Sequence, residues 1–253
     1  MNAPLGVELD AVTHRFGRTE ALTDVSLTLR PGVVTGLVGR NGAGKTTLLS
    51  LVAGLRPAQH GSVRVGGRDV WEDPAVTSRV ALVRDRGGVL EDQRIRHTLT
   101  IHRALRPHWD EEYAVHLLER FGVPSRRRPE QLSTGQRSSL SAVLALASRA
   151  EVTLLDEVYL GMDAVARRMF YEELMADYAA HPRTIVLSSH LLDEVEDLFE
   201  DVVVLDRGRV VAAGDADTVR QQHSTGDHLA SLTDVLVQVS SSSSPSTPGR
   251  TAR

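Results

Sequence analysis

The stretch Gly39-Arg40-Asn41-Gly42-Ala43-Gly44-Lys45-Thr46 fits the pattern G-x-x-x-x-G-K-[ST] at every fixed position. This pattern is typical of a loop that binds the phosphate groups of a nucleotide. Its glycines permit positive φ angles and a close approach of the backbone, so that successive N–H groups converge on phosphate oxygens. In such a loop Lys45 bridges the β- and γ-phosphates, and the Thr46 hydroxyl holds Mg²⁺. We expect the Lys45 side chain to face solvent there.

The flanking sequence supports this interpretation. Residues 33–38 predict a buried strand that enters the loop, and residues 46–53 predict a helix that leaves it. The N-terminus of that helix, at Thr46 and Thr47, adds a partial positive charge beside the phosphates. Lys45 is the only lysine among the 29 lysine and arginine residues of the chain. Because a planar guanidinium does not fit between two phosphates as a compact ammonium does, an accidental glycine-rich turn is the weaker explanation.

The composition limits the classes of protein to consider. With 253 residues, of which 41% are hydrophobic, the chain has ample core for one large domain or two lobes. The net charge of −4 and the absence of a dominant basic face argue against nucleic acid as a partner. The absence of cysteine excludes disulfides and fits a reducing cytosol. We expect no secretory signal, and no apolar run approaches the roughly 18 residues that span a bilayer.

Residues 5–75 read as a β-rich lobe. Residues 25–29 alternate apolar and polar side chains and, with residues 33–38, predict a hairpin; residues 62–65 predict another short strand. Phe16 falls in an expected loop between strands, where it serves either as a platform for stacking a base or for ordinary packing. Spacing alone favours ordinary packing, because most aromatic side chains belong to the core.

Residues 90–150 read as helical. Asp110 is an expected N-cap of a helix that Gly122 ends. Ser133 is the expected N-cap of a long apolar helix that runs through Ala147, and taken alone this stretch is simply a capped core helix. From about Ser240 the sequence is rich in serine and proline, which predicts a disordered tail. We therefore expect one domain over residues 1–240 and a tail over residues 241–253.

Polar side chains follow two further predicted strands. Residues 151–157 form an apolar strand that ends in Asp156 and Glu157, an unfavourable ending unless a cation or a water molecule needs two carboxylates. Residues 184–187 predict a parallel strand, soon followed by His190. Ligands bind at the carboxyl ends of strands in open α/β sheets, although a structural role explains a single histidine there equally well.

Taken together, these segments resemble the ATP-binding subunit of an ABC transporter over roughly residues 5–240. The motifs follow the family's order: the adenine-stacking aromatic Phe16, Walker A at 39–46, the signature Leu132–Gln136, Walker B at 152–157, the D-loop at 161–163 and the switch histidine His190. The signature is the specific part, because other phosphate-loop ATPases lack it. The resemblance implies an α/β fold with a P-loop NTPase core around a parallel sheet, an antiparallel β lobe on the N-terminal side, and a helical subdomain inserted at about residues 90–150.

The resemblance also implies a mechanism. Two such domains, as a homodimer or as a heterodimer with a second ATPase subunit, face each other head to tail with ATP at the interface. The residues that would contact ATP are Phe16, Gly39, Arg40, Asn41, Gly42, Ala43, Gly44, Lys45, Thr46 and Thr47, together with Ser133, Gly135 and Gln136 of the signature. Thr46 and Asp156 would hold Mg²⁺, Glu157 would be the general base, and His190 would contact the γ-phosphate. The partner would be an integral membrane permease, which keeps the chain cytoplasmic on the inner face of the membrane.

Three positions depart from the family pattern. Thr134 replaces a glycine of the signature, and Val158 replaces the proline that usually follows the Walker B glutamate. Asp85 replaces the glutamine of the Q-loop. Asp85 either approaches Mg²⁺ as a ligand or is held away by like charge; a third interpretation is a loop residue that caps the next turn and has no catalytic part.

Two other classes compete with the transporter hypothesis. A non-transporting, ATP-driven regulator can be built on the same domain, although its two-domain cytosolic forms carry two cassettes in one chain. A P-loop nucleoside kinase would need a lid and an acceptor site, and would not need Leu132–Gln136. The transported substrate is set by the permease, so the sequence does not identify it.

Overall fold

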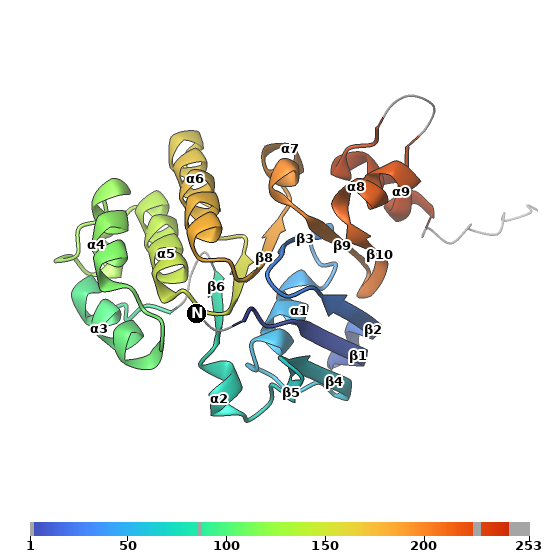
Figure 1. Cartoon of the computed structure of the whole chain (residues 1–253), viewed down its shortest axis with the longest axis horizontal. Coiled ribbons are helices and arrows are strands. Elements are labelled where there is room, and N and C mark those ends of the chain that lie inside the picture. The colour runs from blue at the N-terminus through green and yellow to red at the C-terminus, as the bar shows by residue number, and fades with distance from the viewer. Residues whose placement is uncertain (1–2, 85–87, 225–228, 243–253) are drawn as a thin grey trace, which may run out of the picture.

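The computed structural model describes residues 3–84, 88–224 and 229–242. Its strands form two sheets, one of four strands in the order β2-β1-β4-β5 and one of six in the order β10-β9-β3-β8-β7-β6 (Figure 1). The strands are β1 (Val7–Phe16), β2 (Thr19–Leu29), β3 (Val34–Val38), β4 (His60–Val65), β5 (Arg68–Asp69), β6 (Val80–Arg84), β7 (Val152–Asp156), β8 (Thr184–Ser189), β9 (Asp201–Asp206) and β10 (Arg209–Asp215).

Helices surround the six-stranded sheet. They are α1 (Lys45–Val52), α2 (Pro74–Thr77), α3 (Ile95–Leu105), α4 (Glu111–Arg120), α5 (Thr134–Ser148), α6 (Ala164–Ala180), α7 (Leu192–Val195), α8 (Ala216–Gln222) and α9 (Leu232–Ser242), with the 3₁₀ segments η1 (Pro129–Gln131) and η2 (Glu196–Leu198). Helices α3, α4 and α5 lie together at one end of the molecule, away from the four-stranded sheet (Figure 1). None of the helices in the described part of the chain combines the length and apolar character needed to cross a membrane.

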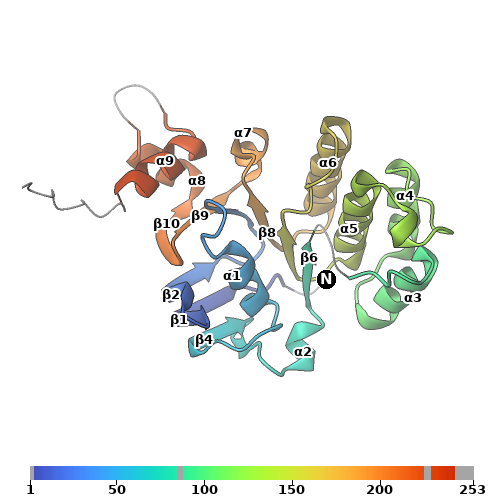
Figure 2. The ribbon, with the colours of Figure 1, turned by 180° about the vertical axis from the view of Figure 1, so that it is seen from behind.

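The central strands are buried on both faces. Every residue of β3 and β7 is buried, as expected for parallel strands covered on two sides. Alternate side chains enter different cores, because successive side chains of a strand point to opposite faces: Val186 belongs to the core with α1 and the four-stranded sheet, whereas Ile185 and Leu187 belong to the core with α5 and α6. Figure 2 shows α1 beside β1, β2 and β4, on the first of these faces.

The parallel register brings three strand ends to one edge of the sheet. β3 pairs in parallel with β8, with Val38 opposite Ser189, and β7 pairs in parallel with β8, with Asp156 opposite Ser188. The residues that follow β3, β7 and β8 therefore meet at the carboxyl edge. The α/β fold expected from the resemblance, with a parallel P-loop core and an antiparallel β lobe, is confirmed.

The predicted hairpin of residues 25–29 and 33–38 is wrong. β2 pairs with β1, with Val7 opposite Leu29, whereas β3 lies in the other sheet between β8 and β9. The burial patterns give the reason: β2 ends in alternating buried and exposed residues, but β3 is buried throughout. The turn at Arg30-Pro31-Gly32 thus passes from one sheet to the other.

Two smaller expectations also need correction. Phe16 is the last residue of β1 and pairs with Thr19, so it lies at a strand end rather than in a loop. Helix α9 continues through Ser242, so the chain is still helical at Ser240, where the tail was expected to begin. The remainder of the predicted tail, residues 243–253, lies outside the described residues.

Candidate functional site

The phosphate-loop motif joins β3 to α1. Gly42 and Gly44 adopt positive φ angles of 82° and 109°, which a residue with a side chain adopts only at a cost. A Cβ on Gly39 would lie 2.4 Å from the carbonyl oxygen of Leu205, and one on Gly44 would lie 2.5 Å from that of Ala21. The loop therefore needs glycine at these positions, both for its own shape and for its fit against neighbouring backbone.

The lysine of the loop is buried. Lys45 is only 6% exposed, so the expectation that its side chain faces solvent is wrong. Its ammonium Nζ donates a hydrogen bond to the carbonyl oxygen of Gly39 at 2.7 Å and lies 3.5 Å from Oε1 of Glu157. The side chain therefore folds back over its own loop, and its charge is balanced by a carboxylate from the end of β7.

Asp156 ends β7 and is held from two sides. Its Oδ1 accepts a hydrogen bond from the Ser188 hydroxyl at 2.9 Å, and its Oδ2 lies 3.5 Å from Nε of Arg84. Arg84 also donates to the hydroxyl of Ser50 on α1 at 2.5 Å. Asp156 is 6% exposed, and its hydrogen bond to Ser188 and the nearby Arg84 charge stabilise a carboxylate at this depth.

Glu157 links the predicted catalytic residues. Its backbone has a φ of 52° and its N–H donates to the Ser188 hydroxyl at 3.1 Å. This left-handed conformation is uncommon for a residue with a side chain and is often found at functional sites. Oε1 of Glu157 lies 3.5 Å from Nζ of Lys45 and 3.6 Å from Nδ1 of His190. The structure thus brings Lys45, Glu157 and His190 together at the carboxyl edge of the sheet.

A buried tyrosine contacts the histidine. Nδ1 of His190 lies 3.0 Å from the hydroxyl of Tyr159, and the backbone N–H of His190 donates to that hydroxyl at 2.9 Å. The Ser189 hydroxyl donates to it as well, at 3.2 Å. Burial raises the pKa of Tyr159 above its ordinary value, which keeps the phenol protonated. The imidazole itself is 41% exposed, so the ring is held at Nδ1 and is still accessible to solvent.

The sequence analysis did not single out Tyr159 or Ser188. Tyr159 comes two residues after the carboxylate pair, and no motif in the sequence marked it. Ser188 lies on the same strand end as His190, and that shared position was the only signal in the sequence. Both hydroxyls matter because they join the end of β7 to the end of β8.

Phe16 lies beside the phosphate loop. It is 42% exposed, so it is not an ordinary core residue. The Arg56 guanidinium lies 5.1 Å from the ring centre, and the His14 ring meets it edge-on at 4.9 Å. Phe16 lines a cavity of about 300 Å³ whose other walls are Thr19, Glu20, Ala21, Glu157 and residues 41–47. An aromatic ring and the loop with its lysine thus line the same cavity.

A second cavity, of about 530 Å³, opens on another side of the loop. It is lined by residues 39–43, His190, Asp206 and Arg207, and by Leu236 and Ser240 of α9. Arg40 and Asn41 are exposed here. The loop and the histidine therefore share an open face of the molecule.

The signature residues lie elsewhere. Ser133 caps α5, because its hydroxyl accepts from the N–H of Gln136 at 3.2 Å, while Oε1 of Gln136 accepts from the N–H of Ser133 at 3.3 Å. The Gln136 amide also donates to the carbonyl of Gly122 at 3.0 Å. Ser133, Gly135 and Gln136 line neither cavity beside the phosphate loop. A single chain thus does not bring the signature to Lys45, and Asp85 lies outside the described residues.

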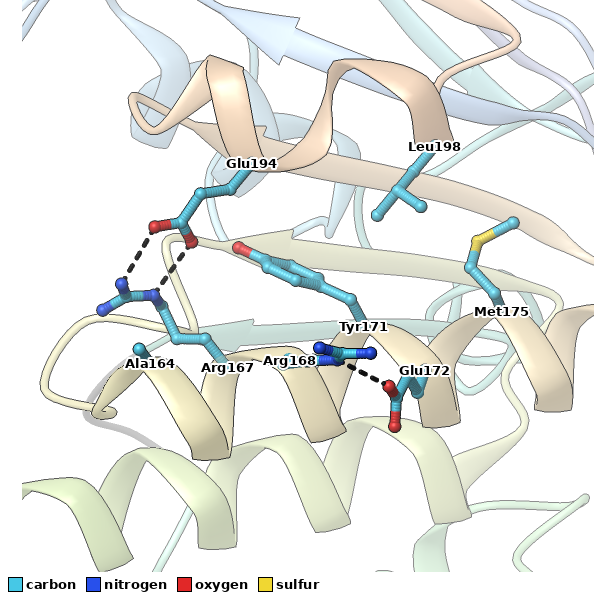
Figure 3. A pocket seen from close by; sticks show the side chains of 8 residues that line it. All are labelled: Ala164, Arg167, Arg168, Tyr171, Glu172, Met175, Glu194 and Leu198. Carbon is cyan, nitrogen blue, oxygen red and sulfur yellow. Dashed lines mark hydrogen bonds and ion pairs between the residues drawn. The ribbon is translucent and has the colours of Figure 1, made fainter.

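A third cavity, of about 520 Å³, lies between α6 and the segment of α7 and η2 (Figure 3). The guanidinium of Arg167 forms two hydrogen bonds with the carboxylate of Glu194 and a third with the carbonyl oxygen of Met162. None of the residues that line this cavity belongs to the predicted nucleotide or metal sites. The cavity is bordered by α6, which follows the D-loop, and by α7, which follows His190.

Comparison with known proteins finds relatives that bind ATP. Residues 22–159 match the ABC transporter family. The ABC transporter ATP-binding protein YtrB of Bacillus subtilis is 29% identical over 217 residues, which cover 86% of this chain and 74% of that protein. The sulfate/thiosulfate import ATP-binding protein CysA of Vibrio cholerae is 33% identical over 215 residues, which cover 81% of this chain and 57% of that protein.

Solved structures share the fold. An ATP-binding subunit of an ABC transporter superposes with a TM-score of 0.80 at 23% identity, over 92% of this chain and 99% of that one. A dimeric ATP-binding cassette in a post-hydrolysis state, bound to ADP and Pi, superposes with a TM-score of 0.72 at 19% identity, over 83% and 98% of the two chains. A phosphate loop between β3 and α1, with two carboxylates at the end of β7 on the far side of β8, defines this fold as that of a P-loop ATPase.

The family match makes the identification more specific. The chain belongs to the ABC transporter family. It is an ATP-binding and ATP-hydrolysing subunit of such a transporter.

Proposed function

We propose that this chain hydrolyses Mg-ATP between two ATP-binding domains that face each other head to tail, and thereby drives a separate membrane permease. The observation that carries the proposal is the position of Glu157, whose carboxylate lies 3.5 Å from the ammonium of Lys45 and 3.6 Å from the ring of His190. A carboxylate beside a phosphate-binding lysine is suited to activate the water that attacks the γ-phosphate.

The shape of the site suits a nucleotide. The cavity beside Phe16 accepts a base against an aromatic ring and leads to the N–H groups of residues 41–47. In this arrangement Lys45 exchanges its contacts with Gly39 and Glu157 for phosphate oxygens. The exchange would free the Glu157 carboxylate to accept a hydrogen bond from water, so substrate binding itself would prepare the base.

The same residues suit Mg²⁺. The Thr46 hydroxyl and the Asp156 carboxylate are hard oxygen ligands, and two protein ligands leave room for phosphate oxygens and water, as Mg²⁺ prefers. No group of three or more acidic, histidine or cysteine side chains able to hold a metal occurs in the described part of the chain, which fits an ion held jointly with the nucleotide. The ion supplies positive charge where negative charge develops during phosphoryl transfer. Asp85 remains a candidate ligand.

The signature suits contact with a nucleotide on a second chain. Ser133 lies exposed at the N-terminus of α5, where its hydroxyl oxygen accepts from the N–H of Gln136 and its proton is available to donate. A helix N-terminus with such a hydroxyl favours a γ-phosphate. The Gln136 side chain is occupied by its bonds to Ser133 and Gly122, so we expect Gln136 to shape this surface rather than to touch the phosphate.

The partner would be an integral membrane permease, and the subunit would lie on the cytoplasmic face of the membrane. Relatives named as import ATP-binding proteins and as the glucosylceramide transporter ABCA12 carry different substrates, so the cargo is not assigned. The chain spans 9% of ABCA12, in which it matches one part of a much longer protein.

Complementation tests the head-to-tail arrangement. Lys45→Met removes the phosphate contact, and Ser133→Asp keeps an N-cap acceptor but places a negative charge against the γ-phosphate. Each variant alone should hydrolyse ATP poorly. In a mixed dimer, however, the Lys45 of one chain meets the Ser133 of the other, so mixing should restore hydrolysis in the permease complex.

Ser133→Asn is the matched control, because it retains the cap without the charge. It should lose less activity than Ser133→Asp. A mixture no more active than its separate components would contradict the shared site.

A further inference from the structure

The hydroxyl of Tyr159 lies at the centre of a hydrogen-bond cluster that joins β7 to β8. Tyr159 is 1% exposed, and three groups approach its oxygen: the Ser189 hydroxyl at 3.2 Å, the backbone N–H of His190 at 2.9 Å and Nδ1 of His190 at 3.0 Å. The Tyr159 and His190 rings are 5.6 Å apart and inclined by 51°. The tyrosine thus contacts both the backbone and the ring of the histidine.

The directions of these hydrogen bonds follow from the donors. The backbone N–H of His190 can only donate, and the Ser189 hydroxyl, which already accepts from the N–H of Leu191 at 3.0 Å, donates to Tyr159. A phenol accepts two hydrogen bonds and donates one. Its own proton is therefore directed to Nδ1 of His190.

We propose that Tyr159 is a positioning residue that holds His190 in the neutral tautomer with its proton on Nε2, so that Nε2–H points to the γ-phosphate and the attacking water. A ring nitrogen that accepts a hydrogen bond carries no proton, and the other nitrogen then becomes the donor. The His190 ring is 41% exposed and lines the cavity with residues 39–43, so Nε2–H is the ring donor that remains free to face that cavity. This inference rests on the proposed function of His190.

The tyrosine also keeps the His190 ring from forming an ion pair with Glu157, the proposed general base. Oε1 of Glu157 lies 3.6 Å from Nδ1, so a proton on Nδ1 would draw the imidazole into a pair with the Glu157 carboxylate. That pair would consume the lone pair that the water needs. A proton donated by Tyr159 occupies Nδ1 from the other side, which separates the phosphate-contacting role of His190 from the proton-accepting role of Glu157.

The phenol suits this task chemically. Burial raises the pKa of Tyr159, so the hydroxyl remains a donor throughout the physiological range. Tyr159→Phe removes only the hydroxyl and keeps the ring in the core. Tyr171 offers a matched control, because it is also buried, at 8% exposure, and its hydroxyl has no hydrogen-bond partner within the described residues (Figure 3).

Nuclear magnetic resonance of the histidine ring tests the proposal without ATP hydrolysis. Two-bond ¹H–¹⁵N correlation spectra of histidine-labelled protein report which ring nitrogen carries the proton, and the His190→Gln variant identifies the His190 signals. We expect the proton on Nε2 in the wild type and in Tyr171→Phe. In Tyr159→Phe we expect a mixture of tautomers or a proton on Nδ1. A proton on Nδ1 in the wild type, or an unchanged tautomer in Tyr159→Phe, overturns the proposal.

Steady-state kinetics of the transporter complex provide a second readout. Tyr159→Phe should lower kcat about tenfold while KM for ATP stays within about twofold, because the tyrosine acts on the chemical step and not on nucleotide binding. Tyr171→Phe should leave both constants unchanged. An unchanged kcat in Tyr159→Phe overturns the positioning role. A wild type that hydrolyses no ATP but carries its proton on Nε2 would instead contradict the proposed function of the site.

Discussion

At the scale of single residues, the site is organised by three charged side chains, those of Lys45, Asp156 and Glu157. Lys45 contacts its own loop and Glu157, Asp156 lies beside Arg84, and Glu157 lies between Lys45 and His190. The Lys45–Glu157 and Asp156–Arg84 ion pairs each balance a charge that is partly withdrawn from water. In the proposed scheme, nucleotide binding would replace these pairs with contacts to phosphate and metal, so the charges of the site are already balanced before ATP binds.

Lys45→Met should abolish ATP binding and also reduce stability. The ammonium donates to the Gly39 carbonyl, and its loss leaves that buried acceptor unsatisfied, at a cost of about 1–3 kcal/mol. Isothermal titration with ATP measures the affinity, and urea unfolding measures the free energy of unfolding. An ATP affinity within a few-fold of the wild type would show that Lys45 does not bind the phosphates.

The sequence predicts which residues belong to the site better than it predicts their burial and their contacts. Lys45, Asp156 and Glu157 follow from motifs, because phosphate and metal binding demand their chemistry at those spacings. The burial of Lys45 and the contact of Tyr159 with His190 do not follow, since both depend on how β7 and β8 meet across the sheet. Residues distant in sequence set those contacts, and no local pattern encodes them.

At the scale of elements, the site depends on how closely strands and their connections pack. β3 runs between β8 and β9, and Gly36 at its centre faces the ring of Phe199. The same requirement for a close approach recurs at Gly39 and Gly44 in the loop that follows. The strand that enters the phosphate loop is therefore fixed by its neighbours before any nucleotide binds.

Gly36→Ala should destabilise the fold without changing the chemistry. The new Cβ would lie 2.4 Å from a ring carbon of Phe199, and overfilling a packed core costs about 1–3 kcal/mol. Urea unfolding should show a lower midpoint, while ATP affinity of the folded protein remains within a few-fold. Phe199→Leu in the same chain should recover part of the loss; an unchanged midpoint for Gly36→Ala would show that the ring moves aside freely.

The prediction from sequence was wrong where the chain passes from one sheet to the other. Alternation identified residues 25–29 as a strand and a nearby turn suggested a hairpin, but β3 is apolar on both faces and belongs to the parallel core. Helices with strong caps were predicted well: Asp110 and Ser133 begin α4 and α5 as expected. Capping is local and visible in sequence, whereas strand partners are chosen over long distances.

At the scale of the whole molecule, the phosphate loop and the signature occupy separate places on one chain. The cavities beside the loop contain Glu157 and His190 but none of the signature residues. A complete site in the proposed scheme therefore needs a second domain, and ATP would hold the two together. Hydrolysis would remove the shared phosphate contacts and allow the dimer to open.

The central claim is that Glu157 accepts a proton from the water that attacks the γ-phosphate, and Glu157→Gln tests it most directly. An amide has the size of the carboxylate but cannot act as a base. We predict that this variant, in the transporter complex, binds ATP within a few-fold of the wild type, hydrolyses it at least about 100-fold more slowly, and remains a dimer while ATP is present. Hydrolysis close to the wild-type rate, measured as phosphate release at saturating ATP, would contradict the account.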